Sequence, residues 1–338
     1  MSLDSLLTPS PPGSQEITGC WFSGTTLLME AVDRGLDDFV KYLVENSSSS
    51  SLDLNAVDSS GCNALFYCAA NGSSKLFEYL VNNQVKLIDD NHHRTVLMQA
   101  AYNAHKDLVN YLMENELSLG LDVNQKDKDG RNVLFYCIEG GNLEMLITLL
   151  EFGIPMQADY NGKNNLFQAV SASHTSIVEY ILKNADKHLK LDVHEKDIHG
   201  NNAMYYYAKR PNDKHILSML ISAGLKLQDC SNMSNIFAQA LKSGDLITAK
   251  MVTSSFESHD VEKVRTILQS WKSEKGETLF HWVAMKNDPE FCELLAPYYD
   301  PISDKDEHNR TPLIRYVSYF IQTSPGFSPM ILGVSVLM

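Results

Sequence analysis

The sequence predicts an all-α solenoid of stacked helix pairs, on the evidence of an internal repeat, a recurring turn and apolar residues at helical spacing. The segment Ala64–Cys68 returns almost unchanged as Val133–Cys137, and a third copy follows at Ala203–Tyr207. Self-similarity of this kind indicates a small stacked module, and binding in such proteins extends along a shared surface. Weaker copies of the pattern lie between these segments, at 24–31, 93–100 and 162–169.

The recurring turn divides the chain into nine modules. In the clearest copies, Asp127–Gly130 and Asp197–Gly200, an Asp leads the turn and a Gly closes it, because Gly adopts a positive φ without steric cost. The spacing between turns alternates between long and short, so the larger recurring element is a pair of modules. The residues in the glycine position are 24, 61, 93, 130, 162, 200, 233, 276 and 309.

Each turn leads into a short first helix, rich in Ala, Leu and aromatic residues, and a tight break separates this helix from a second one. We expect the breaks at Gly35, Gly72, Gly141 and Gly244.

The second helix of each module carries apolar pairs at helical spacing, as at Leu108, Val109, Leu112 and Met113. We expect Asp288 to cap one such helix ahead of Pro289, and C-terminal glycines to end two others at Gly153 and Gly224. Helices of two or three turns are marginal alone in water, so each pair must bury its apolar face against the next.

This pattern resembles the ankyrin-repeat family, in which Asp-x-x-Gly-x-Thr-Pro-Leu-His-x-Ala is followed by a Gly break and a Val-x-x-Leu-Leu helix. The resemblance covers about residues 21–316 and is specific through repetition. Only the ninth module keeps Thr311-Pro312-Leu313, and only the eighth keeps the family histidine, at His281. Elsewhere we expect apolar packing in place of the hydrogen bonds of that histidine, at Met29, Phe66, Met98, Phe135, Phe167 and Tyr205.

Three segments follow from these patterns. Residues 1–20 contain Pro9, Pro11, Pro12 and Gly13 with scattered Ser, which predicts a flexible arm. Residues 21–320 are expected to form the solenoid, with an incomplete last module. Residues 321–338 form an irregular apolar tail, which motivates the hypothesis that the chain is a shortened form of something longer. The serines Ser47–Ser51 are expected to form a plain flexible loop in the first long connection.

The composition excludes several kinds of function. A net charge of −14 argues against general binding of nucleic acids or anionic membranes. The charge either serves solubility alone or favours a basic or neutral protein partner. We see no signal peptide and no apolar run long enough to span a membrane, and expect a monomer in the cytoplasm, with the nucleus left open. Cys68 and Cys137 are expected to be buried, reduced thiols.

No catalytic constellation, metal-ligand spacing or phosphate-binding loop stands out, so we expect neither an enzyme nor a cofactor or metal. The leading hypothesis is a protein–protein interaction scaffold or adaptor. The alternative is the regulatory ankyrin arm of a larger enzyme, such as a kinase or ubiquitin ligase, whose catalytic part is absent from this chain.

The resemblance implies that partners bind in a concave groove lined by the first helices and the hairpin tips. One helix position alternates between polar and aromatic residues, and its aromatic members either line that groove or pack against the neighbouring first helix. The candidate partner-binding residues are Tyr67, Tyr102, Asn103, Lys128, Asp129, Arg131, Tyr136, His199, Tyr206, Lys209, Arg210 and Trp282.

Overall fold

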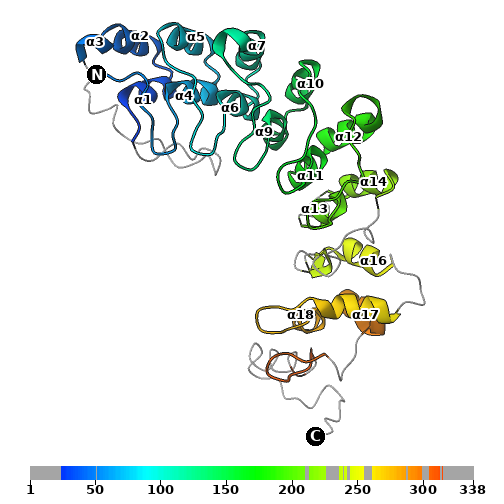
Figure 1. Cartoon of the computed structure of the whole chain (residues 1–338). Coiled ribbons are helices and arrows are strands. Elements are labelled where there is room, and N and C mark those ends of the chain that lie inside the picture. Colours follow the sequence, from blue (N-terminus) through cyan, green and yellow to red (C-terminus); the bar gives the residue numbers. More distant parts are fainter. Residues whose placement is uncertain are drawn as a thin grey trace. The chain divides into compact units, whose positions relative to one another are not determined.

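The chain folds into successive pairs of short α-helices, and the part that the structure describes contains no β-strand (Figure 1). The fold class predicted from the sequence is therefore confirmed. The computed structural model describes residues 24–50, 52–209, 213–225, 236–238, 240–241, 244–254, 261–286, 288–298, 304–312 and 314. It divides into an N-terminal unit, Met1–Tyr160, and a C-terminal unit, Asn161–Met338.

In the N-terminal unit the first helices of successive modules form one layer and the second helices form the other (Figure 1). The first helices are α1 (Leu27–Asp33), α4 (Ala64–Asn71), α6 (Val96–Tyr102) and α9 (Val133–Gly140). The second helices are α2 (Asp37–Glu45), α5 (Ser74–Asn82), α7 (Lys106–Glu114) and α10 (Leu143–Glu151).

The C-terminal unit repeats the same arrangement. Its first helices include α11 (Asn165–Ser171), α13 (Ala203–Lys209) and α18 (Leu279–Lys286), and its second helices include α12 (Thr175–Asn184), α14 (Lys214–Ser222) and α19 (Pro289–Leu295). The remaining elements are α16 (Leu246–Ser254), α17 (Val261–Ser270) and the 3-10 helix η4 (Ala296–Tyr298).

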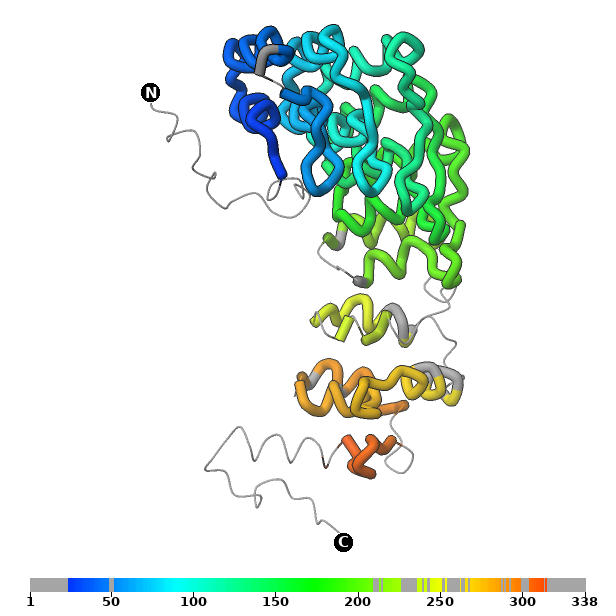
Figure 2. Tube along the Cα trace, turned by 60° about the vertical axis from the view of Figure 1, so that its left-hand side comes forward, coloured from blue at the N-terminus to red at the C-terminus, as the bar shows by residue number. Residues whose placement is uncertain are grey.

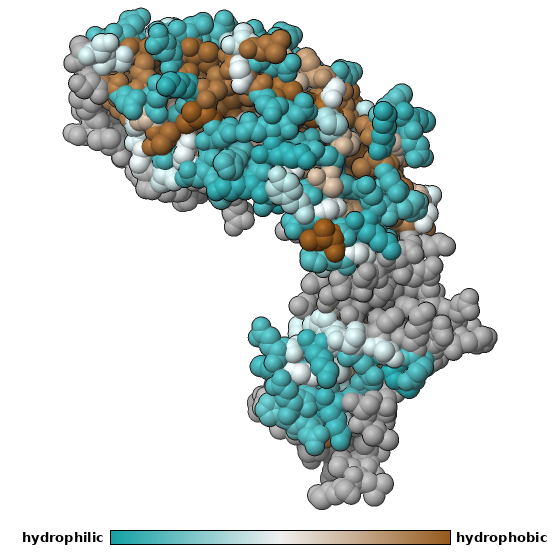
Figure 3. Space-filling model, in the orientation of Figure 1, coloured by the Kyte–Doolittle hydropathy of each residue, from teal (hydrophilic) through white to brown (hydrophobic). Residues whose placement is uncertain are grey.

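The core lies between the two helix layers of each unit, where nearly every apolar residue of the first helices is buried. The second helices bury one face only, as Leu108, Val109 and Leu112 do in α7. On the face of the molecule in Figure 3, apolar residues of the N-terminal unit gather toward the helix layers and hydrophilic residues toward the hairpins. The hairpins are therefore the polar margin of a continuous apolar core.

The expected helix boundaries are largely confirmed. Asp288 accepts a hydrogen bond from the backbone N–H of Glu290 at the start of α19, at 3.0 Å. Gly153 and Gly224 follow the ends of α10 and α14 with positive φ. Residues 1–20, the tail 321–338 and the turn at 233 lie outside the described residues.

Three of the long connections differ from a plain loop, because each of the three begins with an extra turn of helix. Ser47–Ser50 form α3 rather than a plain loop, Glu116–Leu119 form α8, and Ala185–Leu189 form the π-helix η2. An asparagine stands at each junction, and its side-chain amide donates to the carbonyl four residues earlier at 2.8 Å. Asn46, Asn115 and Asn184 thus hold the end of the second helix while the chain turns into the next.

The closest backbone approach among the glycines involves Gly140, the last residue of α9. A Cβ atom added there would lie 2.0 Å from the carbonyl oxygen of Tyr102 in α6. At the corresponding position of α4, Asn71 instead donates its side-chain amide to the carbonyl of Val32 at 2.8 Å. The last residue of a first helix therefore sets how closely that helix approaches the preceding first helix.

We predict that Gly140→Ala destabilises the protein by about 1–3 kcal/mol, because the methyl group overpacks a rigid backbone contact. Helix propensity alone predicts the opposite sign, since Ala is favoured over Gly in a helix by about 0.5–1 kcal/mol. Urea denaturation of the full chain separates the two. A stabilised variant would show that α6 and α9 do not approach as closely as described.

Candidate protein-binding surface

Most of the described hairpins contain a buried aspartate, whereas Ser273 stands at this position in the hairpin before α18. Asp58, Asp90 and Asp127 are each 4–5% exposed, although they stand in turns at the protein surface. In each, Oδ1 accepts backbone N–H groups two and four residues later, at 2.8–2.9 Å. The aspartate therefore fixes the shape of the turn, and its second oxygen needs a donor from elsewhere because an unpaired buried carboxylate is costly.

In three modules that follow a long connection, that donor is a tyrosine of the first helix. The hydroxyl of Tyr67 donates to Oδ2 of Asp58 at 3.0 Å, and that of Tyr136 donates to Oδ2 of Asp127 at 2.6 Å. Burial, together with the hydrogen bond to Asp127, raises the pKa of Tyr136. The hydrogen bond joins the hairpin to the helix it precedes.

The C-terminal unit repeats this contact and reinforces it. Tyr206 donates to Oδ2 of Asp197 at 2.6 Å, and the amide of Asn201 lies 3.1 Å from the same oxygen. Burial alone would raise the pKa of Asp197, but the hydrogen bonds from Tyr206 and Asn201 outweigh it and hold that pKa below its ordinary value. The carboxylate is thus kept ionised inside the turn.

In two modules that follow a short connection, an arginine of the hairpin replaces the tyrosine. Nε of Arg94 lies 2.5 Å from Oδ2 of Asp90, and Nε of Arg310 lies 2.8 Å from Oδ2 of Asp306. Burial opposes ionisation of Asp306, but the Arg310 contacts prevail and lower its pKa to about 2. In these five modules, the difference between a long and a short preceding connection is therefore also a difference between two ways of satisfying one buried carboxylate.

These contacts decide between the two roles that the sequence leaves open for the aromatic residues. Tyr67, Tyr136 and Tyr206 are 3%, 7% and 5% exposed, and their hydroxyls point into the hairpins. They pack and do not line a groove, so they are removed from the candidate contact surface. Trp282 differs, because it is half-buried and meets Trp271 edge to face with ring centroids 5.4 Å apart.

The other predicted residues fall into two groups within the N-terminal unit. Tyr102 and Asn103 are half-buried at the end of α6, where burial and then the charge of Glu139 raise the pKa of Tyr102. Lys128 and Asp129 are exposed on a hairpin tip. These are opposite ends of the first helices, so the structure does not bring all predicted residues together.

Arg131 is half-buried beside the tip and lies 3.4 Å from Asp129. In the C-terminal unit His199 is exposed on its own tip. Lys209 ends α13, and nothing is described of its side chain; Arg210 lies outside the described residues.

Successive tips of the N-terminal unit are held in register by backbone hydrogen bonds. Asn91 donates to Ser60, Lys128 to His92 and Tyr160 to Asp129, at 2.8–3.0 Å. Figure 2 shows the corresponding loops extending side by side away from the helices. Tyr160, with 67% of its surface exposed, is a candidate that the sequence prediction missed. The available signal was its position, two residues before the glycine of its turn, as Lys128 is before Gly130.

Comparison with known protein families identifies the family to which these helix pairs and hairpins belong. A family model described as ankyrin repeats in three copies matches residues 5–89, 28–127 and 97–191, together more than half of the chain. The chain belongs to the ankyrin-repeat family. As in ankyrin-repeat domains generally, a role in protein interaction follows at this coarse level, without a named partner.

The relatives of this ankyrin-repeat chain include much longer proteins. It is 32% identical over 117 residues to mouse protein fem-1 homolog A-like and 35% identical over 96 residues to an L-asparaginase of Dirofilaria immitis. These matches cover 35% and 28% of this chain but 17% and 15% of the relatives. A further match, to Caenorhabditis elegans protein glp-1, is 24% identical and covers 72% of this chain and 17% of glp-1.

Among solved structures, the ankyrin repeat domain of Bcl-3 is similar, with a TM-score of 0.48 and 20% sequence identity. The match covers 61% of this chain and 89% of the Bcl-3 domain.

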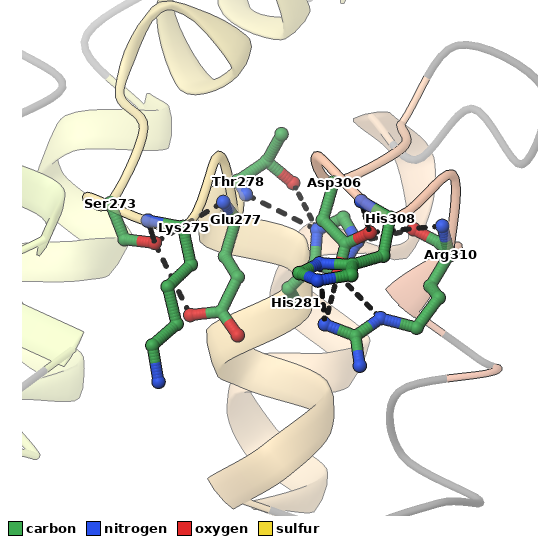
Figure 4. A network of polar contacts seen from close by, with 8 residues as sticks. All are labelled: Ser273, Lys275, Glu277, Thr278, His281, Asp306, His308 and Arg310. Atoms are coloured by element: carbon green, nitrogen blue, oxygen red, sulfur yellow. Dashed lines mark hydrogen bonds and ion pairs between the residues drawn. The ribbon is translucent and has the colours of Figure 1, made fainter.

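The one ankyrin histidine that this chain keeps links two successive hairpins. Figure 4 shows His281 between Thr278 and the hairpin that carries Asp306, His308 and Arg310. Its Nδ1 accepts from the backbone N–H and hydroxyl of Thr278 at 3.2 and 2.9 Å, and its Nε2 lies 2.9 Å from the carbonyl of Arg310. Since a carbonyl only accepts, Nε2 carries the proton.

Where the ankyrin histidine is missing, apolar packing replaces it as expected. Phe66, Phe135 and Phe167 are at most 4% exposed. The methionines retain part of the polar role, because Sδ of Met29 and of Met98 accepts the backbone N–H of the preceding Thr cap, at 3.4 and 3.5 Å. The cap therefore survives although the contact to the next hairpin does not.

The described residues give no sign of a chemical site. They contain no group of three or more His, Cys, Asp or Glu side chains placed to hold a metal ion. Nor do they include a helix long and apolar enough to cross a membrane. Cys68 and Cys137 are buried free thiols, and burial raises the pKa of Cys137 to about 12.

We predict that Tyr136→Phe lowers stability by about 1–3 kcal/mol, because Oδ2 of Asp127 then loses its donor in a buried site. Tyr206→Phe should cost less, since Asn201 also contacts Oδ2 of Asp197. Urea denaturation measures both, with Tyr42→Phe as the control because Tyr42 is 60% exposed. Equal losses in all three variants would refute the role assigned to the hydroxyls.

We predict that Asp33→Asn stabilises the protein at pH 8 and not at pH 4. Burial, then the charge of Glu30, raise the pKa of Asp33 from 3.8 to about 6. A raised carboxyl pKa means that ionisation disfavours folding, so its cost appears as pH rises from about 4 through about 6. Thermal midpoints of wild type and variant across this range test the prediction, and a pH-independent difference would contradict it.

Proposed function

We propose that this chain is a protein-binding scaffold or adaptor whose contacts are made by the hairpin tips and the exposed ends of the first helices. The observation that carries the proposal is the row of tips in the N-terminal unit. Backbone hydrogen bonds hold these tips in register, while Lys128 and Tyr160 remain exposed on them. A rigid surface with exposed side chains loses little entropy when it binds.

The base of each hairpin supports this proposal through its rigidity. Asp127 is tied to two backbone N–H groups and to Tyr136, so the tip above it is held in one shape. The same contacts keep the tyrosines away from a partner. The contact surface is accordingly more polar than an aromatic groove, which fits a soluble adaptor that assembles and dissociates.

We further propose that the chain is a cytoplasmic monomer without catalytic activity of its own, and that its partners are proteins. Its net charge of −14 gives neither a nucleic acid nor an anionic membrane a general electrostatic attraction.

A second candidate is that the chain acts as the regulatory arm of a larger enzyme. One observation favours it: the L-asparaginase of Dirofilaria immitis, an enzyme by name, matches this chain over only 15% of its own length. Sequencing of transcripts from the same locus distinguishes the two candidates. A catalytic domain encoded downstream in the same reading frame favours the enzyme arm, and its absence from every transcript favours the adaptor.

We predict that proteins crosslinked to the full chain in cells attach at the tips of the N-terminal unit and beside Tyr102. Affinity capture with crosslinking mass spectrometry identifies both the partner and the attachment residues. Recovery of that partner should fall with Lys128→Ala or Tyr102→Ala, but not with Lys75→Ala on the outer helix α5. Crosslinks confined to the second helices would overturn the proposed surface.

A further inference from the structure

The tips at the C-terminal end of the N-terminal unit carry an unusual combination of cations and an exposed aromatic ring. We call His92, Lys128, Arg131 and Tyr160 the tip surface. The hydrogen bonds from Lys128 N–H to the His92 carbonyl and from Tyr160 N–H to the Asp129 carbonyl place these residues on adjoining hairpins. All four belong to the same unit of the structure.

The cations of the tip surface are available because the buried aspartate does not use them. Arg131 stands four residues after its turn aspartate, as Arg94 and Arg310 do. Those two arginines pair with Asp90 and Asp306, whereas Tyr136 occupies the corresponding oxygen of Asp127. Arg131 therefore turns to the exposed Asp129, at 3.4 Å.

Lys128 adds a second positive charge to the same hairpin. It is exposed, and no described carboxylate lies within ion-pairing distance of its ammonium group. A partner carboxylate meeting Lys128 and Arg131 would gain attraction from both, with little internal competition beyond Asp129.

Tyr160 supplies the apolar part of the surface. Its side chain is exposed, yet its ring rests on the backbone of Gly130, where an added Cβ atom would lie 2.6 Å from a ring carbon. Gly130, at φ +84°, therefore leaves room for the ring, because the Cβ atom of any other residue would overlap it. A ring supported in this way presents a fixed contact area, as binding hot spots do.

We propose that the tip surface binds an acidic, extended segment of a partner protein, with a carboxylate at Lys128 and Arg131 and an apolar side chain on Tyr160. This inference rests on the proposed protein-binding function and adds the chemistry of the partner. It differs from the expectation of a basic or neutral partner, which followed from net charge, because Lys128 and Arg131 lie together on one hairpin.

A phosphate-bearing partner such as RNA would meet the same cations, but the observations favour a peptide. Nucleic-acid binding draws its affinity from many phosphate contacts, and this hairpin offers two cations on a protein of net charge −14. A single supported tyrosine suits one apolar side chain. RNA is accordingly kept as an outcome of the test.

The experiment selects a phage-displayed library of random linear peptides against the immobilised full chain. The enriched sequences should contain Asp or Glu next to an apolar residue. Labelled synthetic copies are then titrated by fluorescence polarisation, at low and high salt. Binding should weaken as salt rises, because exposed charge pairs are screened.

Two variants with matched controls locate the site. Lys128→Glu should weaken binding of the acidic peptides at least about tenfold, as reversal of a contact charge does. Lys75→Glu makes the same change in net charge on α5 and should have no effect. Tyr160→Ala should also weaken binding, whereas Tyr42→Ala removes an equally exposed tyrosine from α2 and should not. Unchanged thermal midpoints confirm that the variants are folded.

Three results would overturn the inference: enriched peptides without acidic residues, equal binding to wild type and Lys128→Glu, or tighter binding of a single-stranded RNA oligonucleotide than of any acidic peptide. Neutral peptides that still depend on Tyr160 would leave the proposed function standing and remove only the acidic specificity. If neither the crosslinks nor peptide binding changes in any tip variant, both the proposed function and the acidic specificity are contradicted.

Discussion

The carboxylate buried at the base of most described hairpins is the constraint on which the rest of this structure depends. A charged oxygen enclosed in a turn is costly unless every lone pair finds a donor. Asp127 meets this need with the backbone N–H groups of Asp129 and Arg131 and the hydroxyl of Tyr136. The local donors fix the turn, and the distant donor fixes the turn to its helix. Without them, the tips would have neither a defined shape nor a defined register.

Two kinds of module differ in where the third donor comes from. When a tyrosine of the first helix supplies it, that helix position is buried and unavailable to a partner. When Arg94 supplies it from within the hairpin, the corresponding helix position carries Gln99, which is only half-buried. The same choice determines the partner of the hairpin arginine. Because Tyr136 donates to Asp127, Arg131 pairs with the exposed Asp129 instead. A difference in internal hydrogen bonding thus becomes a difference in the carboxylate with which the hairpin arginine pairs.

The repeat, the helix pairs and several helix ends could be predicted from the sequence, because glycine turns and apolar spacing are local signals. The role of Tyr67, Tyr136 and Tyr206 could not, since aromatic residues at a half-buried helix position suit packing and binding equally well. Only the distance from each hydroxyl to an aspartate nine residues earlier decides the matter. The helical turn at Ser47–Ser50 was missed for a different reason: serine has only a moderate helix propensity, and no sequence signal marks a new helical turn after α2 ends at Glu45.

In each of these hairpins, one residue serves stability and its neighbour is free to vary for recognition. The residue directly after the turn aspartate points away from the buried base, so its identity carries little cost in folding. Within this one chain that position holds Ser59, Asn91, Lys128, Tyr160 and Ile198, while the aspartate before it is retained each time. Chemically different tips can therefore stand on bases that share the same buried aspartate. The specificity of this solenoid then lies in the order of its tips, and the net charge of the whole chain is a poor guide to any one of them.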